Sequence, residues 1–126
     1  MLNEFDQQIR LKVLQMLKDS PAMSQRKMNK KMGVSLGKVN YCISKLTEQS
    51  MIRVKRFKNA KNKAAYSYHL TPTGIDELAT LTMNFLKKRI KEYDEIKLEI
   101  KELSEQVQEM DTDFIKNLKL NAVLEK

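Results

Sequence analysis

The chain has 126 residues, with 24 Lys and Arg against 16 Asp and Glu, and its isoelectric point is near 9.6. This length allows one small domain with an appended helix and only a modest core. One cysteine excludes an internal disulfide, and a single His outside any Cys/His/Asp grouping leaves metal sites and catalytic triads without candidates. No apolar run could cross a bilayer or serve as a signal peptide. We therefore expect a cytoplasmic protein with no metal, cofactor, enzyme activity or membrane partner.

The positive charge is concentrated in the first part of the chain. Residues 1–74 hold 15 Lys and Arg against 4 Asp and Glu, whereas residues 75–126 hold 9 against 12. A basic part joined to a mildly acidic part is expected when one part binds a polyanion and the other does not. Charge alone leaves open the alternative of a Lys-rich surface that only keeps the protein soluble.

Three short helices are predicted before residue 51. Apolar residues recur at helical spacing over residues 6–18, and Ser20-Pro21 ends this helix because proline disfavours the α region for the residue before it. A second helix over residues 24–32 begins at a serine cap and stops at Gly33. A third helix, over residues 35–50, also begins at a serine cap. Its apolar stripe has spacings of three and four and consists of Leu36, Val39, Ile43 and Leu46.

A β-hairpin is predicted after the third helix, because the hydrophobic period changes to two. Ile52 and Val54 alternate with cationic residues in the first run, and Tyr66 and Tyr68 alternate with small or polar residues in the second. The polar segment 58–63 joins the two runs as a short loop, which is typical of an antiparallel hairpin.

A long helix is predicted from Pro72 to about Met110, with Thr71 as its cap and proline at the first helical position. The helix would run roughly 55–60 Å. Apolar residues follow in steps of three and four along it, except at Thr82 and Arg89, and this is a heptad seam. The rest of a 126-residue chain is too small to bury the apolar face of so long a helix, so we expect another chain to bury the seam.

The third helix has the features of a recognition helix for DNA. A helix enters the major groove when it turns polar residues outward and packs its apolar stripe on the preceding helices. Gly37 would allow a close approach, and Asn40 can donate to and accept from a base edge. Residues at the start of the second helix are placed for phosphate contacts, helped by the helix dipole. The candidate DNA-binding residues of the two helices are Ser24, Gln25, Gly37, Lys38, Asn40, Tyr41, Ser44 and Lys45.

The predicted hairpin, which we call the wing, supplies a second candidate contact at its loop. Residues 55–63 contain five cations and no acid, an arrangement that repels itself unless a polyanion lies nearby. A solvated charged loop is the alternative reading. The candidate DNA-binding cations of this wing include Arg56, Lys58, Lys61 and Lys63.

The stretch MSQRKMNKKMGVSLGKVNYCISKLTEQSMIRVKRF, followed by YSYHLTPTG, resembles the winged-helix domains of the MarR family. The likeness covers about residues 5–105 and is nearest to the small regulators associated with exopolysaccharide gene clusters. It implies a dimeric DNA-binding transcription factor. The recognition positions that the resemblance implies are Ser35, Gly37, Lys38, Asn40, Tyr41 and Lys45, and the wing positions are Arg56, Lys58, Asn59, Lys61 and Lys63. Many MarR-type regulators carry a helix before the winged domain. This chain begins almost at the winged domain, which moves the expected dimer interface to the C-terminal helix.

The candidate dimerisation residues lie on the heptad seam of the long helix. Its early part has a wide apolar face that suits domain packing, and beyond Tyr93 it narrows to a two-helix seam. Ile100 and Val107 at position a, with Leu103 at d, favour a parallel pair, although antiparallel pairing and higher oligomers stay open. The candidate dimerisation residues are Leu86, Tyr93, Ile96, Ile100, Leu103, Val107 and Met110.

The predicted fold is mainly α with a small β-hairpin: a winged helix-turn-helix over residues 1–71 and a long coiled-coil helix within residues 72–126. Asp111-Thr112-Asp113 indicates a further cap, consistent with a short terminal helix from about residue 113. We expect a sequence-specific transcriptional regulator that binds double-stranded DNA as a homodimer. The alternative is a protein-interaction adaptor that keeps the fold and recruits partners through its coiled coil. The sequence identifies no small-molecule effector.

Overall fold

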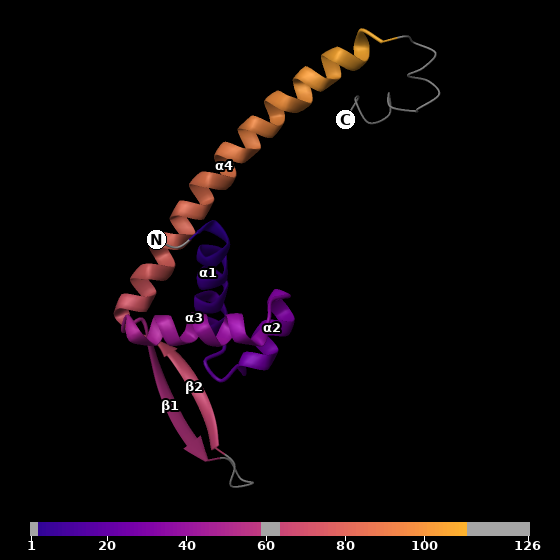
Figure 1. Ribbon diagram of the computed structural model, residues 1–126. Coiled ribbons are helices and arrows are strands. Elements are labelled where there is room, and N and C mark those ends of the chain that lie inside the picture. Colours follow the sequence, from indigo (N-terminus) through magenta and orange to yellow (C-terminus); the bar gives the residue numbers. More distant parts are fainter. Residues whose placement is uncertain (1–2, 59–63, 111–126) are drawn as a thin grey trace. The chain divides into compact units, whose positions relative to one another are not determined.

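The computed structural model describes residues 3–58 and 64–110, and it confirms a mainly helical fold with one antiparallel hairpin (Figure 1). The terminal helix expected from about residue 113 lies outside this range. The elements are α1 (Glu4–Asp19), α2 (Gln25–Met32), α3 (Leu36–Glu48), β1 (Ile52–Lys58), β2 (Ala64–Leu70) and α4 (Pro72–Gln108).

Side-chain caps fix where the helices begin, and the predicted serine caps are confirmed. The Ser24 hydroxyl accepts a hydrogen bond from the Lys27 N–H, and the Ser35 hydroxyl accepts one from the Lys38 N–H, both at 3.1 Å. Gly33 ends α2 at a φ of 68°, a left-handed conformation that glycine adopts without steric cost. Helix α1 begins at Glu4 rather than Asp6, because Asn3 caps it by accepting the Asp6 N–H.

The core of the N-terminal unit lies where α1, α2 and α3 meet. Six side chains are less than 2% exposed, and they come from all three helices. They are Val13, Leu14, Leu17, Met28, Val39 and Leu46. Three residues of the apolar stripe predicted for α3, Val39, Ile43 and Leu46, therefore pack inward, whereas Leu36, at the start of the helix, is exposed.

The hairpin packs its base on this core and extends beyond it. Ile52 pairs with Leu70 and Val54 with Tyr68, which confirms the predicted alternation. Ile52 and Tyr68 are buried, whereas Val54, which pairs with Tyr68, is exposed. The outer edge of β2 is paired as well, since the Tyr68 N–H donates to the Pro21 carbonyl at 2.8 Å.

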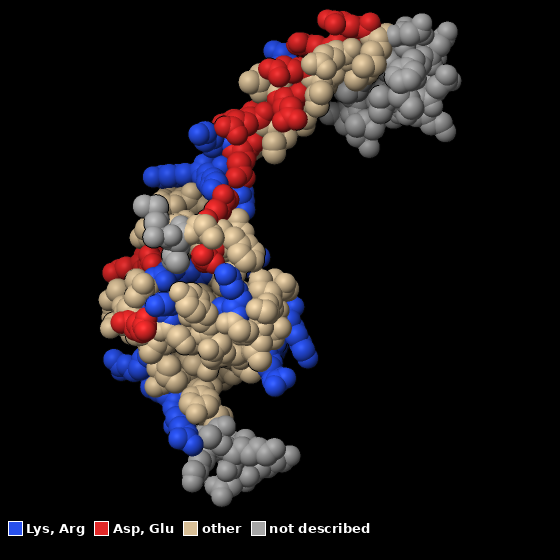
Figure 2. Space-filling model, in the orientation of Figure 1, with Lys and Arg blue, Asp and Glu red and all other residues tan. Residues whose placement is uncertain are grey.

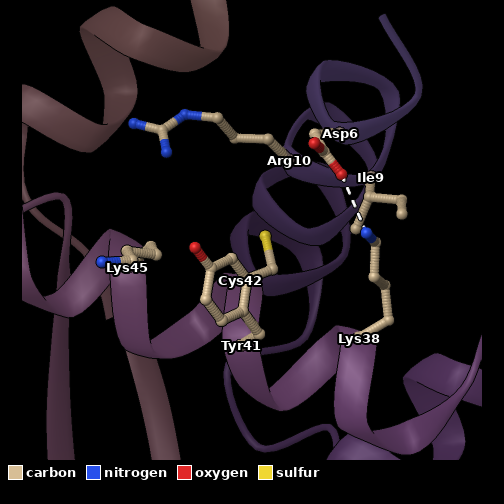
Figure 3. Close-up of a pocket in the computed structure, with 7 residues that line it drawn as sticks. All are labelled: Asp6, Ile9, Arg10, Lys38, Tyr41, Cys42 and Lys45. Atoms are coloured by element: carbon tan, nitrogen blue, oxygen red, sulfur yellow. Dashed lines mark ion pairs between the residues drawn. The ribbon is translucent and has the colours of Figure 1, made fainter. Parts of the chain in front are cut away.

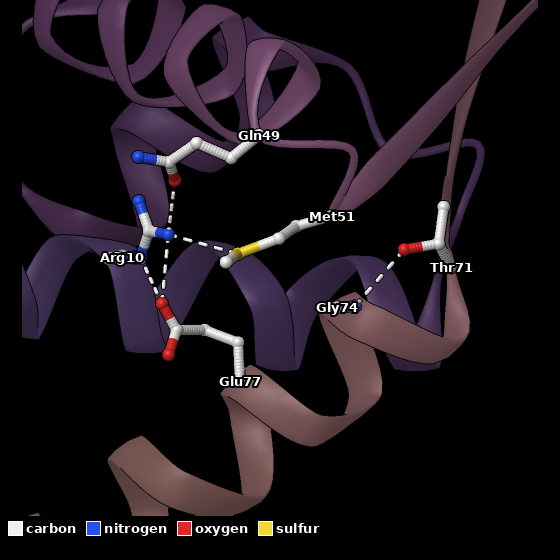
Figure 4. A network of polar contacts seen from close by, with 6 residues as sticks. All are labelled: Arg10, Gln49, Met51, Thr71, Gly74 and Glu77. Carbon is white, nitrogen blue, oxygen red and sulfur yellow. Dashed lines mark hydrogen bonds and ion pairs between the residues drawn. The ribbon is translucent and has the colours of Figure 1, made fainter.

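Helix α4 begins in close contact with the segment that precedes the wing. The Thr71 hydroxyl caps the helix by accepting the Gly74 N–H at 3.1 Å, and the Thr71 N–H donates to the Met51 carbonyl at 3.1 Å (Figure 4). A Cβ atom at Gly74 would lie 2.0 Å from the Met51 carbonyl oxygen. Only glycine fits this contact without a backbone shift.

The chain divides into two compact units, residues 1–84 and 85–126. The first includes the opening turns of α4, where Leu78 and Leu81 are buried. The assignment of residues 1–71 to DNA binding and of residues 72–126 to dimerisation stays a prediction.

The described part of the second unit carries one exposed apolar face. Six of the seven candidate dimerisation residues have exposed fractions of 48–56%, and Val107 is partly buried. The six are Leu86, Tyr93, Ile96, Ile100, Leu103 and Met110.

Candidate nucleic-acid interface

The outer face of α3 is open and polar. Val39, Ile43 and Leu46 point into the core, so residues about half a turn away point outward. Tyr41 is 58% exposed on this face. The other candidates with exposed side chains or surfaces here are Gly37, Asn40 and Ser44, together with the cap residue Ser35.

A chain of hydrogen bonds ties this face to α2 and to the wing. The Asn40 amide donates to the Gln25 side-chain oxygen at 3.2 Å, and the Gln25 amide donates to the Tyr68 hydroxyl at 3.1 Å. These two bonds therefore link Asn40 of α3, Gln25 of α2 and Tyr68 of β2 in one chain. Gln25 orients Asn40 as well as standing at the start of α2.

The two candidate lysines of α3 have partners within the chain. Lys38 pairs with Asp6 at 3.0 Å and lies over the Phe5 ring at 5.6 Å, so it is turned towards α1 rather than outward. Lys45 pairs with Glu48 at 3.2 Å, and the hydrogen bond and charge of this carboxylate raise the pKa of the Lys45 ammonium group. The Lys45 ammonium also lies over the Tyr41 ring, at 5.6 Å from its centre. Both ion pairs are partly or largely exposed, so solvent weakens them and a phosphate can exchange for the carboxylate.

A small pocket lies between α1 and α3, with Cys42 at its wall (Figure 3). Its volume of about 30 Å³ leaves room for a water molecule and not for an organic effector. Burial raises the pKa of the Cys42 thiol to about 11, because the lowering effect of Arg10 and Lys38 is smaller. The thiol is therefore protonated and poorly nucleophilic at neutral pH, as expected for a structural cysteine.

An open groove lies where the start of α2, the start of α3 and the wing meet, with a volume of about 490 Å³. It brings together Ser24 and Gln25, which the sequence had singled out. It also contains Arg26 and Tyr66, which the sequence reasoning missed. Their signal was weak, because Arg26 is one of many cations and Tyr66 shares the alternation of the inward-facing Tyr68. The full lining is Ala22, Ser24, Gln25, Arg26, Leu36, Ala65, Tyr66 and Tyr68.

The described part of the wing is basic. Arg56 is exposed on β1, and so are Arg53 and Lys55 on the same strand. Figure 2 shows Lys and Arg side chains over the N-terminal unit, and Asp and Glu gathered along the later part of α4. Lys58 is the last residue of β1. The candidates Asn59, Lys61 and Lys63 lie outside the described residues.

Residues 3–58 and 64–110 contain neither a metal-ligand cluster nor a membrane-spanning helix. No group of three or more His, Cys, Asp and Glu side chains is placed to hold a metal ion there. Within the same ranges, no helix has the length and hydropathy needed to span a membrane.

Residues 6–53 match the family described as winged helix-turn-helix DNA-binding. None of the curated protein sequences is similar enough to count as a relative. Among solved structures, the chain is similar to the regulator TA0346 of Thermoplasma acidophilum, with a TM-score of 0.63, 19% identity and coverage of 74% of this chain and 94% of that one.

Two further structures have similar folds. A PadR-like transcription factor from Bacteroides fragilis has a TM-score of 0.59 at 14% identity, covering 73% of this chain and 92% of its own. The MarR-family transcription regulator SP03579 has a TM-score of 0.50 at 12% identity, covering 81% of this chain and 74% of its own. At these identities the likeness establishes the fold, and the fold is that of a winged helix-turn-helix.

Proposed function

Because residues 6–53 are a winged helix-turn-helix of the DNA-binding type, we propose that the chain is a sequence-specific transcriptional regulator of the MarR family that binds double-stranded DNA as a homodimer. The observation that carries this proposal is the open surface shared by the start of α2, the outer face of α3 and the wing. The sequence resemblance favours the group of regulators associated with exopolysaccharide genes. A cytoplasmic location and the lack of enzyme activity follow from this function.

Helix α3 is the element we assign to the major groove. Its outer face offers Asn40, whose amide can form two hydrogen bonds with an adenine edge, and Tyr41, whose exposed side chain carries a hydroxyl that can meet a base. Gly37 has no side-chain bulk, and a Cβ there would meet only the Ser35 hydroxyl, at 4.0 Å. The backbone of α3 can therefore approach DNA closely at this turn. Ser44 lies on the same face, and Ser35 is exposed at the start of the helix as its cap.

Phosphate contacts would come from three places around α3. The start of α2 presents backbone N–H groups and the Gln25 and Arg26 side chains, which suit an anion at the positive end of a helix dipole. Lys38 and Lys45 are on the outer part of α3 and can exchange their carboxylate partners, the half-buried Asp6 and the exposed Glu48, for phosphates. The wing adds the cations Arg56, Lys58, Lys61 and Lys63, with Asn59 among them, on the flanking backbone or minor groove.

Substitutions on α3 and on the wing should have different effects. Asn40→Ala and Tyr41→Ala should each lower affinity for the preferred sequence by about 1–3 kcal/mol and leave affinity for random DNA unchanged, because base contacts carry the specificity. Lys61→Gln with Lys63→Gln should weaken both kinds of DNA alike, because phosphate contacts carry no sequence information. Titrations of the two duplexes with each variant measure this. A loss of equal size on both duplexes for Asn40→Ala would contradict the assignment of α3.

Helix α4 is the element we assign to dimerisation. Its apolar face leaves six large side chains about half exposed on a single helix, which is unfavourable in water unless a second helix covers them. A second copy of the chain offers the same seam, and a two-fold dimer matches a two-fold operator.

A charge placed in the seam should dissociate the dimer. Ile100→Glu should raise the dimer dissociation constant by about 100-fold or more, because the carboxylate would be buried without a partner. Leu98→Glu is the matched control, since Leu98 and Ile100 are 57% and 56% exposed and lie on opposite sides of the helix. Sedimentation equilibrium measures both. Equal dissociation of the two variants, or none in either, would show that the seam is not part of the dimer interface.

The alternative function is a protein-interaction adaptor that keeps the winged-helix fold. Such a protein would bind DNA weakly and without sequence preference, and its coiled coil would recruit other proteins. The titrations on preferred and random duplexes separate the two functions directly.

A further inference from the structure

Arg10 is a buried cation at the junction of four segments of the N-terminal unit. It lies on α1, and its side chain is 7% exposed. Its guanidinium contacts Glu77 on α4, Gln49 at the end of α3 and Met51 at the approach to the wing (Figure 4). One side chain therefore joins the first helix, the recognition helix, the wing and the long helix.

The contacts of Arg10 are directional. Its Nε and Nη2 atoms both lie 2.8 Å from the same Glu77 oxygen, and Nη2 also donates to the Gln49 side-chain oxygen. The Met51 sulfur lies 2.9 Å from Nη2. A guanidinium presents its donors in a rigid planar fork, so these contacts fix angles as well as distances. A lysine ammonium at this position would keep the positive charge but lose the planar arrangement of several donors.

Stability alone is a poor explanation for this arrangement. A buried ion pair is often no more stabilising than apolar residues of the same volume, and its best-attested use is to select one arrangement among several. The neighbouring contacts have the same character, since Thr71 caps α4 and also donates from its hydroxyl to the Ser50 carbonyl. The end of α3 and the start of α4 are thus held by polar contacts that accept one geometry.

We propose that Arg10 is a positioning residue, which fixes the recognition helix and wing on the first turns of α4 and thereby sets the half-site spacing that the dimer prefers. This inference rests on the proposed function, because a spacing exists only for a dimer that binds two half-sites. Arg10 lies behind the DNA-binding surface and acts through Gln49, Met51 and Glu77 rather than on DNA.

The test varies the spacing between two half-sites one base pair at a time. Glu77→Gln removes the charge that holds Arg10, and Asp76→Asn removes the same charge from the exposed neighbouring position. We expect the wild type and Asp76→Asn to prefer one spacing. Glu77→Gln should bind a single half-site as the wild type does but lose about tenfold in affinity at the preferred spacing, with a flatter profile. Arg10→Lys should behave like Glu77→Gln, since it keeps the charge without the fork.

The outcomes separate this inference from the function on which it rests. A folded Glu77→Gln variant with the wild-type spacing profile would show that the ion pair has no positioning role. A wild type that binds paired half-sites more tightly than a single one, but with no preferred spacing, would contradict this inference alone. A wild type that binds paired half-sites no more tightly than a single one would contradict the dimeric function itself, and with it this inference. If Arg10→Lys fails to fold, Glu77→Gln decides, because it leaves the Gln49 and Met51 contacts of Arg10 in place.

Discussion

Replacing Gly74 by alanine is expected to destabilise the protein by about 3 kcal/mol or more, the cost of forcing an atom into a close-packed contact. The new Cβ would lie 2.0 Å from the Met51 carbonyl oxygen and 3.0 Å from its carbonyl carbon. Both atoms belong to the backbone, so no side-chain rotation relieves the contact. The start of α4 would have to move away from Met51, and the Thr71–Met51 hydrogen bond would be lost with it.

The expected loss of stability is opposite in sign to the usual effect of a Gly→Ala substitution in a helix. A glycine inside a helix is normally about 0.5–1 kcal/mol less favourable than alanine, so the ordinary Gly→Ala substitution stabilises. Gly37→Ala is the matched control, because a Cβ at Gly37 has only the Ser35 hydroxyl nearby, at 4.0 Å. Denaturant unfolding at equal protein concentration should show Gly74→Ala destabilised and Gly37→Ala unchanged or stabilised. Equal stability of the two variants would mean that α4 does not pack on Met51 as described.

The affinity of the dimer for DNA is expected to fall roughly 10³–10⁵-fold between 50 and 200 mM salt, if about 6–10 phosphates are contacted. The reason is that each neutralised phosphate releases a counterion, and the N-terminal part of the chain carries most of the positive charge. The slope of log affinity against log salt should become shallower by about 0.9 for every phosphate contact removed.

Wing variants provide the internal control for this slope. Lys61→Gln with Lys63→Gln should flatten the slope, because these side chains are assigned to phosphates. Asn40→Ala should lower affinity with the slope unchanged, because it is assigned to a base. Affinity that stays constant across this salt range would contradict an electrostatic contact with the DNA backbone.

The elements of the fold could be predicted from the sequence because their signals are local. Serine caps, a left-handed glycine and a change of hydrophobic period mark boundaries that depend on neighbouring residues alone. The structure agrees with these boundaries to within a few residues, and it confirms that Val39, Ile43 and Leu46 of the α3 stripe face inward while Leu36 does not. The short cap at Asn3 was missed, so the first helix was predicted to begin too late.

The candidate interface was only partly predictable, because it depends on contacts between elements. Lys38 lies near the edge of the α3 stripe. Its ion pair with Asp6 depends on how α1 packs beside α3, which the sequence alone does not give. The sequence also cannot distinguish Gly74, which touches backbone, from Gly37, which faces open space. Arg10 looks like an ordinary surface cation in the sequence, yet it is buried among three partners.

Selection of bound fragments from random double-stranded DNA tests the central claim most directly. We expect an inverted repeat to be enriched, and the wild-type protein to bind it about 10³-fold or more tightly than random DNA at physiological salt. Asn40→Ala should relax the preference at one position of each half-site. Equal affinity for enriched and random DNA, with no repeat recovered, would contradict sequence-specific recognition by α3 and favour the adaptor.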